Sequence, residues 1–422
     1  MPPHRRARSE VNEAAMPAVL PGGMPAGEFL ADYWQRRPLL IPNAWPDFAS
    51  PGDAADSLPI SPDELAGLAC EDDVEARLIL ERHGPTPWHV EHGPFAEDRF
   101  ASLPQSHWTL LVQSVDHRIP GVAALREAFD FLPRWRLDDI MISYAAPQGS
   151  VGPHRDQYDV FLIQGMGRRE WRLGAPVGAE DEYLTDSGLC LLHRFDETAR
   201  YVLEAGDMLY LPPGVPHHGI ALEAGMTLSV GFRAPAADEC LAVAAELLPA
   251  LARPLPRFGD AGRETAAFPG AIDAADLTRL RETLRPLLDD DGLLAEVLGR
   301  LGTESPMLEV AGADPITFTG LLSNDRDTML ARHPAARLAW FEHAGGALRF
   351  FCNGESRHFA APRGTRLRPL VQTLCERTRY RAAELAACLP EDPPAREAGR
   401  QLLDELLAQA VLLADEDGDD GP

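Results

Sequence analysis

The stretch GPHRDQYDVFLIQGMGRREWRL, residues 152–173, decides how the fold and the site of this sequence are interpreted. A Gly-Pro turn precedes His154 and Asp156, and an apolar run typical of a buried strand follows them. Residues two apart on a strand point to the same face, so His154 and Asp156 can reach one ion while Arg155 points away. The motif alone occurs by chance in many proteins, and a metal site therefore needs a third ligand from elsewhere.

The third ligand is predicted in GDMLYLPPGVPHHG, residues 206–219, where an apolar strand leads to a Pro-Pro-Gly turn and then to His217 and His218. The separation of 63 residues from His154 to His217 leaves room for several strands to wrap a barrel. Neighbouring residues on an extended segment face opposite ways, so one of the two histidines binds, and spacing does not choose between them. Two histidines and a carboxylate form the facial triad that suits non-haem Fe(II) and leaves coordination positions open.

The sequence around these motifs has the pattern of short strands and turns that is typical of a β-barrel. From Trp108 to Phe232, short alternating, β-branched or aromatic runs are separated by turns that contain Gly and Pro, which predicts a barrel or a sandwich. Upstream, FLADYWQRRPLLI predicts a helix that stops at Pro38 and feeds a strand, and Ser61 with Glu64 predicts a helix capping box. The barrel runs are WTLLVQSV, DIMISYAA, YDVFLIQG, REWRL, YVLEAGDMLYL and TLSVGF.

The composition is that of an ordinary globular protein with more than one domain. The chain has 422 residues, 45% of them hydrophobic and 25% charged, and this length exceeds what one compact core usually holds. A formal charge of −26 repels nucleic acid and attracts basic partners. Six scattered cysteines without a CxxC pair indicate reduced thiols and a cytoplasmic location. No run has the length of a membrane span or the core of a signal peptide.

Beyond residue 235 the pattern becomes helical. Apolar residues recur at three-and-four spacing along residues 277–301, and these faces predict packing among the helices and pairing with a second subunit. Farther on, Asn353-Gly354 between apolar runs predicts a hairpin, and helices beside a hairpin indicate a winged-helix-like module. The basic stretch RGTRLRPLVQTLCERTRYR raises DNA binding as an alternative, against which the acidic surroundings and the tail DEDGDDGP argue.

A buried cation is predicted next to the metal site. An organic acid bound to the metal needs a positive group for its far carboxylate, and GRREWRL supplies Arg168 and Arg169 just after the apolar strand. These two residues alternate faces, so one can point inward while the other meets solvent. Arginine has a fixed fork of donors that matches a carboxylate. Without a metal site, two surface arginines on a strand edge would be the simpler interpretation.

With these residues in place, HRDQYDVFLIQGMGRREWRL, GDMLYLPPGVPHHG and TLSVGFRAP resemble the JmjC-type ribosomal oxygenases. The nearest likeness is the bacterial branch, which hydroxylates an arginine of large-subunit ribosomal protein sixteen. The resemblance implies an α+β protein: a double-stranded β-helix of the JmjC/cupin jelly-roll type, a helical dimerisation domain and a C-terminal winged-helix-like domain. The implied boundaries are a flexible leader at 1–22, the catalytic domain with its N-terminal helices at 23–235, the dimerisation domain at 236–302, the winged-helix-like domain at 303–414 and an acidic tail at 415–422.

The resemblance also implies roles for single residues. The family triad of His-x-Asp and the first histidine after the Pro-Pro-Gly turn maps onto His154, Asp156 and His217, which leaves His218 out. A basic residue fifteen positions after the first ligand holds the side carboxylate of 2-oxoglutarate in that family, and this position is Arg169. Thr227 departs from the pattern, because an asparagine is expected there in close relatives.

The implied activity is Fe(II)- and 2-oxoglutarate-dependent hydroxylation by O2 of an arginine at its β-carbon. The implied partners are a basic ribosomal protein of the large subunit as substrate and a second copy of the chain, with neither membrane nor nucleic acid. Tyr158 and Asp159 are candidates for holding the guanidinium. Two alternatives stay open: a 2-oxoglutarate oxygenase that acts on another protein residue or a small molecule, and a barrel that senses a metal and binds DNA.

Overall fold

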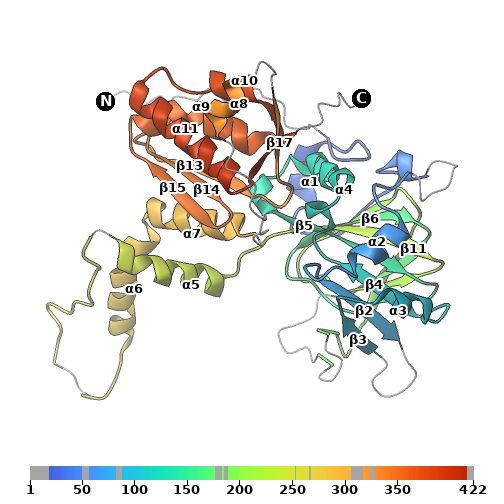
Figure 1. The fold of residues 1–422 in the computed structure, drawn as a ribbon. Helices are drawn as coiled ribbons and strands as arrows, with labels where there is room; N and C mark the ends of the chain where they lie inside the picture. Colours follow the sequence, from blue (N-terminus) through green and yellow to red (C-terminus); the bar gives the residue numbers. More distant parts are fainter. Residues whose placement is uncertain are drawn as a thin grey trace. The chain divides into compact units, whose positions relative to one another are not determined.

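The chain folds into two compact units. The computed structural model describes residues 19–49, 57–81, 88–175, 183–184, 189–251, 253–265, 268–305, 317–323 and 328–415. The units are Met1–Ala234 and Pro235–Pro422, and each has its own hydrophobic core. In Figure 1 the first unit runs from blue to light green and the second from yellow-green to red.

The first unit is built on two antiparallel sheets, as the repeated short runs predicted. The larger has the strand order β1-β9-β6-β11-β5-β4-β2-β3, and the smaller has the order β10-β7-β8. Sequence neighbours such as β6 and β7 lie in different sheets, which is the crossing pattern of a jelly roll. The strands are β1 Leu39–Ile41, β2 Ala76–Glu81, β3 Trp88–His92, β4 Trp108–Val112, β5 Leu137–Ala145, β6 Asp159–Met166, β7 Arg169–Gly174, β8 Glu197–Leu203, β9 Met208–Leu211, β10 His217–Ala221 and β11 Gly225–Phe232.

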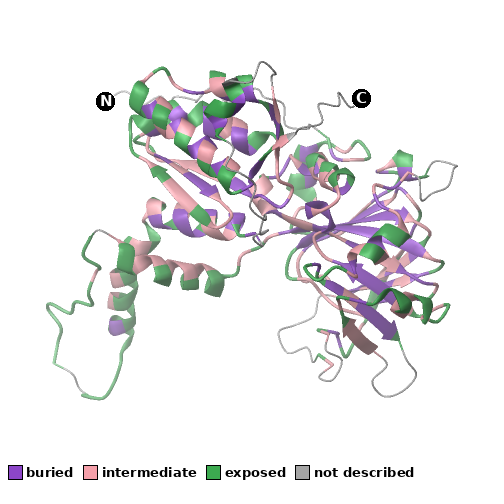
Figure 2. Cartoon of the chain, in the orientation of Figure 1, coloured by how far each residue is buried: buried purple, intermediate pink, exposed green. Residues whose placement is uncertain are grey.

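Alternation along the strands separates an outer core from the barrel interior. On β6, Phe161 and Ile163 join the large core, whereas Val160 and Leu162 join a smaller cluster with side chains of β7, β8 and β9. This smaller cluster contains residues of both sheets and therefore lies between them. Gln164 follows Leu162 by two residues and shares its face. Figure 2 shows β6 and β11 of the larger sheet as mostly buried.

The outer face of the large sheet is covered by the N-terminal helices. Phe29 of α1 and Leu65 of α2 are fully buried in the large core. The capping box predicted for α2 is present, with Glu64 N–H donating to Ser61 Oγ and Ser61 N–H to Glu64 Oε2. These helices are α1 Ala26–Asp32, α2 Pro62–Leu68, α3 Glu97–Ala101 and α4 Pro120–Ala124, with 3-10 turns η1 Pro46–Ala49, η2 Val115–His117, η3 Leu125–Phe129 and η4 Arg134–Arg136.

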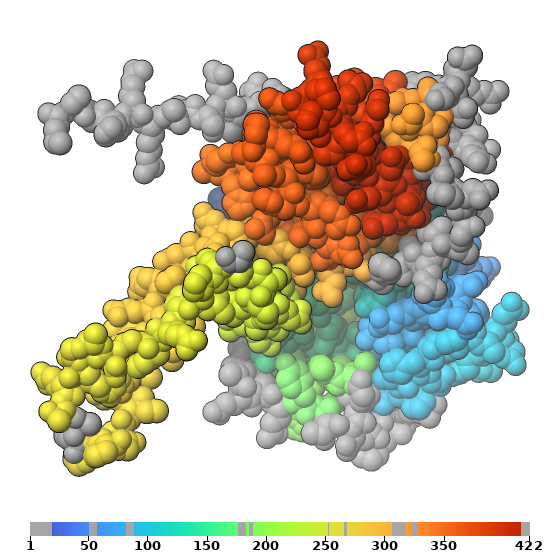
Figure 3. Space-filling view, turned by 60° about the vertical axis from the view of Figure 1, so that its left-hand side comes forward, coloured from blue at the N-terminus to red at the C-terminus, as the bar shows by residue number. Residues whose placement is uncertain are grey.

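The second unit begins with helices α5 Ala237–Leu247, α6 Ala274–Leu288 and α7 Asp291–Thr303, as the three-and-four spacing predicted. Helix α7 packs on a three-stranded sheet, because Gly299 leaves room for the Phe351 ring and Glu296 pairs with Arg349. Helix α6 buries little, and Asp276 is its single buried residue. Figure 3 shows the α5–α6 region (yellow-green to yellow) projecting from the rest of its unit.

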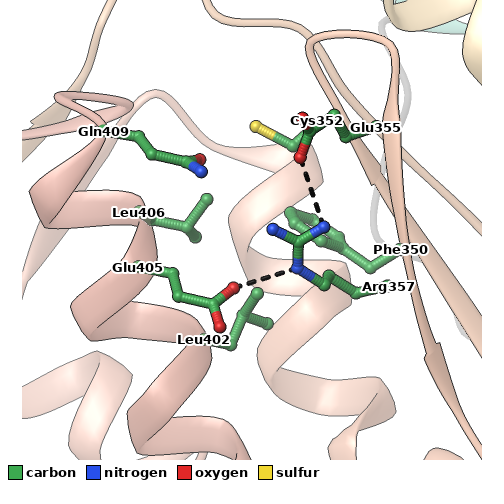
Figure 4. Close-up of a pocket in the computed structure, with 8 residues that line it drawn as sticks. All are labelled: Phe350, Cys352, Glu355, Arg357, Leu402, Glu405, Leu406 and Gln409. Carbon is green, nitrogen blue, oxygen red and sulfur yellow. Dashed lines mark hydrogen bonds and ion pairs between the residues drawn. The ribbon is translucent and has the colours of Figure 1, made fainter.

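The remainder of the unit contains the predicted hairpin and more sheet than the sequence indicated. Asn353 and Gly354 have positive φ angles of 47° and 81° and join β14 to β15, and β13 extends this hairpin to three strands. Arg357 of β15 pairs with Glu355 and with Glu405 of α11 (Figure 4). The other elements form a second sheet, β16-β12-β17, and the helices around it. The description of this region as a winged-helix-like domain and the domain boundary at residue 302 stay predictions. The bounds are η5 Leu248–Ala250, α8 Phe318–Ser323, β12 Met329–Arg332, β13 Leu338–Glu342, β14 Leu348–Cys352, β15 Glu355–Phe359, α9 Arg363–Glu376, β16 Arg379–Arg381, α10 Ala382–Ala387, α11 Pro393–Ala408 and β17 Leu412–Asp415.

Two further predictions can be compared with the described residues. All six cysteines lie among them, and none of them forms a disulfide there. Over the same part of the chain, no helix has the length and apolar character needed to cross a membrane.

Candidate metal centre and co-substrate pocket

The segment that carries His154 and Asp156 is not a strand, so that part of the prediction was wrong. Strand β6 begins only at Asp159, and His154 meets His217 in an isolated bridge in which each N–H donates to the other's carbonyl. The Asp156 carbonyl then accepts the N–H of Gly214 in the Pro-Pro-Gly turn. The segment leaves the ladder because this turn takes its backbone groups, and both side chains nevertheless reach one point.

The ligand atoms of His154, Asp156 and His217 come together as predicted. They all lie within 4.8 Å of one another, and Nε2 of His217 is 3.5 Å from Oδ2 of Asp156. Nδ1 of His154 lies 2.9 Å from the Gly152 carbonyl, and Nδ1 of His217 lies 3.0 Å from the Val215 carbonyl. A carbonyl only accepts, so each Nδ1 carries the proton and each Nε2 presents its lone pair.

The structure chooses between the two neighbouring histidines. His217 is 2% exposed and faces the barrel interior, whereas the side chain of His218 packs near Phe195, outside the ligand cluster. Burial, with a smaller contribution from His154, lowers the pKa of His217 to about 4. His217 is therefore neutral at physiological pH and available as a ligand.

Arg169 is the buried one of the two neighbouring arginines, as the family resemblance implied. It is 4% exposed, and its Nη1 donates to the hydroxyls of Ser143 at 3.3 Å and Thr227 at 3.2 Å. Burial lowers its pKa to about 10, so it keeps its charge at neutral pH. No carboxylate of the described residues forms an ion pair with Arg169, and its Nε has no hydrogen-bond partner there. A buried charge without a partner is unfavourable unless a ligand supplies the opposite charge.

Gly219 lets Arg169 and Trp171 pack against the strand that carries His217. A Cβ at Gly219 would lie 2.8 Å from Nε of Arg169 and 2.7 Å from the Trp171 ring, so only glycine permits this close packing. The guanidinium lies 4.9 Å from the centre of the Trp171 ring, and the ring of His217 lies 5.7 Å from the indole. The buried cation and His217 thus adjoin the same indole.

Of the two candidates for substrate contact, Asp159 was wrong. Its carboxylate is fully buried, and it accepts hydrogen bonds from Tyr210 at 2.7 Å and Gln35 at 3.0 Å, so it serves the core. Tyr158 is 43% exposed and borders the barrel mouth. A Cβ at Gly231 would lie 3.8 Å from the Tyr158 ring and 3.7 Å from Oδ1 of Asp139.

Asp139 is the residue that the sequence interpretation missed. It lies on β5 two and four residues before Met141 and Ser143, and so shares the face that leads to Arg169. Its Oδ2 accepts the N–H of Ser114 at 2.8 Å and the hydroxyl at 3.1 Å. Burial, and then the nearby Asp116, raise the pKa of Asp139 to about 6. The run DDIMISYAA contains the signal, because a carboxylate at a core-facing position of a strand is unusual.

These residues fit a divalent metal of the iron type. Two imidazoles and one carboxylate, without a thiolate, are the donor set of non-haem Fe(II) sites with open positions. Backbone carbonyls fix both imidazoles, and a buried cation lies nearby against the Trp171 ring. A jelly roll with this interior defines the class of cupin-type, metal-dependent oxygenases.

The comparisons with known proteins define the family. The family model described as JmjC domain matches residues 124–240. The chain is 39% identical over 291 residues to the ribosomal protein uL16 3-hydroxylase of Escherichia coli K12, which covers 68% of this chain and 74% of that protein. The X-ray structure of E. coli YcfD has a TM-score of 0.75 and 33% identity, over 92% of this chain and 98% of that chain. A YcfD structure with cobalt and 2-oxoglutarate, described as a ribosomal oxygenase, has a TM-score of 0.73 and 33% identity over the same shares.

The chain therefore belongs to the JmjC-type ribosomal oxygenases, and the resemblance seen in its motifs is confirmed.

Proposed function

We propose that this chain is an Fe(II)- and 2-oxoglutarate-dependent hydroxylase that modifies an arginine of ribosomal protein uL16 at its β-carbon. The observation that carries the proposal is the ligand cluster beside a buried arginine that has no carboxylate partner among the described residues. It is supported by the similarity to the E. coli uL16 3-hydroxylase. Position 3 of an arginine is its β-carbon, which agrees with that relative's name.

His154, Asp156 and His217 would hold the metal, with the Nε2 atoms of the histidines as donors. When bound, Fe(II) together with 2-oxoglutarate and O2 supplies the oxidising power to insert one oxygen atom into a C–H bond, while 2-oxoglutarate becomes succinate and CO2. The chain's own contribution is to keep the imidazoles neutral and oriented and to bury the pocket. The lowered pKa of His217 and the two carbonyl contacts support that role.

Arg169 would bind the far carboxylate of 2-oxoglutarate. Hydroxyls of Ser143 and Thr227 hold its Nη1, and the Trp171 ring supports the guanidinium. An incoming carboxylate would neutralise a charge that burial disfavours, which favours binding of a dicarboxylate over a monocarboxylate. Gly219 lets the guanidinium and the Trp171 ring pack closely against β10.

Asp139 would pair with the guanidinium of the substrate arginine. Its Oδ2 is held by Ser114, and its Oδ1 borders the space over Gly231 beside the Tyr158 ring. A raised pKa means that this carboxylate lacks solvation, and a cation would supply what it lacks. An aromatic ring at the same place can support a planar guanidinium by stacking. The carboxylate thus supports arginine as the substrate side chain, and the net charge of −26 would favour encounter with a basic ribosomal protein.

The family likeness and the exposed leucines of α6 support a homodimer. Leu277, Leu280, Leu284 and Leu288 are between 45% and 59% exposed and recur at three-and-four spacing on one helix. A stripe of this kind pairs well with a copy of itself, because the same spacing recurs on the partner helix. We propose that the segment 236–302 forms this contact and that the enzyme acts in the cytoplasm, where free thiols persist.

The test is mass spectrometry of a uL16 peptide after incubation with the protein, Fe(II), 2-oxoglutarate and O2. The expected result is a gain of one oxygen on an arginine, absent with His154→Ala. Succinate formation without peptide oxidation would overturn the substrate and keep the co-substrate. Absence of both products with the wild-type protein would overturn the proposed function as a whole.

A further inference from the structure

Three hydrogen bonds in series lead from Arg169 through Thr227 and Gln164 to the backbone carbonyl of Met166. Nη1 of Arg169 donates to Thr227 Oγ1 at 3.2 Å. The Thr227 hydroxyl then donates to Oε1 of Gln164 at 3.0 Å. Nε2 of Gln164 donates to the carbonyl of Met166 at 2.8 Å. Gln164 is 1% exposed, so no water replaces these contacts.

The donor and acceptor roles in this series of hydrogen bonds are set at the Met166 carbonyl. A hydroxyl can either donate or accept toward a given neighbour, whereas the two ends of an amide have fixed roles. The Met166 carbonyl accepts only, so it requires the NH2 end of Gln164 and turns Oε1 toward Thr227. Thr227 must then give its single proton to Gln164 and offer a lone pair to Arg169. If the Gln164 amide were reversed, its Oε1 would face the Met166 carbonyl oxygen. The Thr227 hydroxyl would then lie between two donors, the Gln164 NH2 group and Nη1 of Arg169.

The backbone at this point is built for the contact. The register between β6 and β11 shifts at Met226/Thr227, where Gly165 is an extra residue on β6 between Gln164 and Met166. Such bulges re-aim side chains next to functional sites. The bulge brings the Met166 carbonyl within reach of the amide two residues earlier on the same strand. A Cβ at Gly225 would lie 2.4 Å from that carbonyl and 3.3 Å from Nε2 of Gln164, so glycine keeps this position open as well.

We infer that Gln164 is a positioning residue for co-substrate binding, which acts through Thr227 to hold Arg169 in the orientation that receives the far carboxylate. The inference rests on the proposed role of Arg169 toward 2-oxoglutarate. Thr227 and Ser143 together restrain Nη1, and this restraint fixes the guanidinium against Trp171 and Gly219. Without Gln164 the Thr227 hydroxyl is free to rotate, and Arg169 loses part of its orientation.

The experiment compares two ligands that differ only in the far carboxylate. Binding of 2-oxoglutarate and of 2-oxopentanoate is measured by calorimetry on the full-length protein loaded with Mn(II), so that no turnover occurs. The ratio of the two affinities isolates the contact with Arg169, because general damage to the site weakens both ligands alike. Gln164→Leu is expected to lower the affinity for 2-oxoglutarate about tenfold and to leave that for 2-oxopentanoate unchanged.

Companion variants separate the possible outcomes. Thr227→Val is expected to reproduce the effect of Gln164→Leu, and Thr227→Ser is expected to retain the wild-type preference for 2-oxoglutarate. The double variant Gln164→Leu/Thr227→Val is expected to add little to either single change, because both residues belong to one series of hydrogen bonds. If Gln164→Leu does not fold, the Val and Ser variants of Thr227 carry the same test. An unchanged preference, or an equal loss for both ligands, would overturn the inference. Arg169→Met should abolish the preference; if it does not, the proposed role of Arg169 itself fails.

Discussion

Replacing Asp139 by asparagine should make the protein more stable and at the same time inactive toward its peptide. The pKa of Asp139 is raised from 3.8 to about 6, chiefly by burial. The folded state therefore binds more protons than the unfolded state between these values, and stability falls as the pH rises through this window. Above about pH 6 the charge destabilises the native state by up to about 3 kcal/mol, since one pKa unit corresponds to about 1.4 kcal/mol.

The asparagine side chain would carry no charge and could still accept from Ser114 through its amide oxygen. At pH 7.5 we expect Asp139→Asn to raise the free energy of unfolding by about 1 to 3 kcal/mol, measured by urea denaturation. The gain should shrink toward zero near pH 4, where the folded wild-type protein holds this carboxyl in its protonated, uncharged form. Asp138→Asn is the matched control, because Asp138 is 47% exposed and its pairing with Arg233 is worth at most about 1 kcal/mol.

Activity should change in the opposite sense. Loss of one partner of a desolvated charge pair costs about 2 to 5 kcal/mol, so kcat/KM for the uL16 peptide should fall at least about 30-fold in Asp139→Asn. The KM for 2-oxoglutarate should stay the same, because Arg169 is not touched. Wild-type activity on the peptide should also fall below about pH 6, as Asp139 is protonated. A variant that is less stable at neutral pH, or that hydroxylates the peptide within threefold of wild type, would refute this reasoning.

Three further experiments test the metal ligand, the packing around Arg169 and the dimer contact. His217→Ala should abolish Mn(II) binding in calorimetry, whereas His218→Ala should retain it; equal losses would contradict the assignment of one ligand. Gly219→Ala should raise the KM for 2-oxoglutarate about tenfold or more with metal affinity unchanged, because the added Cβ would lie within 3 Å of the neighbouring guanidinium and indole. In light scattering, the wild-type protein should have the mass of a dimer and the double variant Leu280→Asp/Leu284→Asp the mass of a monomer. A dimeric double variant would show that another surface forms the dimer, and a monomeric wild type would show that no dimer forms.

Much of the site followed from the sequence because its signals are local. The His-x-Asp motif, the Pro-Pro-Gly turn and the arginines after the apolar strand are short patterns, and together they indicate a metal site with a neighbouring cation. Alternation on a strand required one of Arg168 and Arg169 to face inward, and the family resemblance pointed to Arg169. The strand assumed for His154 failed because tertiary hydrogen bonds to the Pro-Pro-Gly turn took the backbone groups that a ladder would have used.

The substrate side of the pocket could not be predicted in the same way. Asp159 and Asp139 are both acidic residues beside apolar runs, and nothing local distinguishes them. Only the packing shows that Asp159 accepts hydrogen bonds from Tyr210 and Gln35, whereas Asp139 keeps one oxygen close to Gly231 and the Tyr158 ring.

By itself, then, the sequence determined the barrel, the metal-binding residue types and the cation, because periodicity and turn chemistry act over a few residues. The tertiary structure decided which histidine joins the ligand cluster, which aspartate faces Gly231 and Tyr158, and how Gln164 connects to Arg169. Those choices depend on contacts between strands far apart in the chain, such as β6 with β11 and β7 with β10. Register and burial exist only once the sheets have formed, and they assign one role or another to residues that look alike in the sequence.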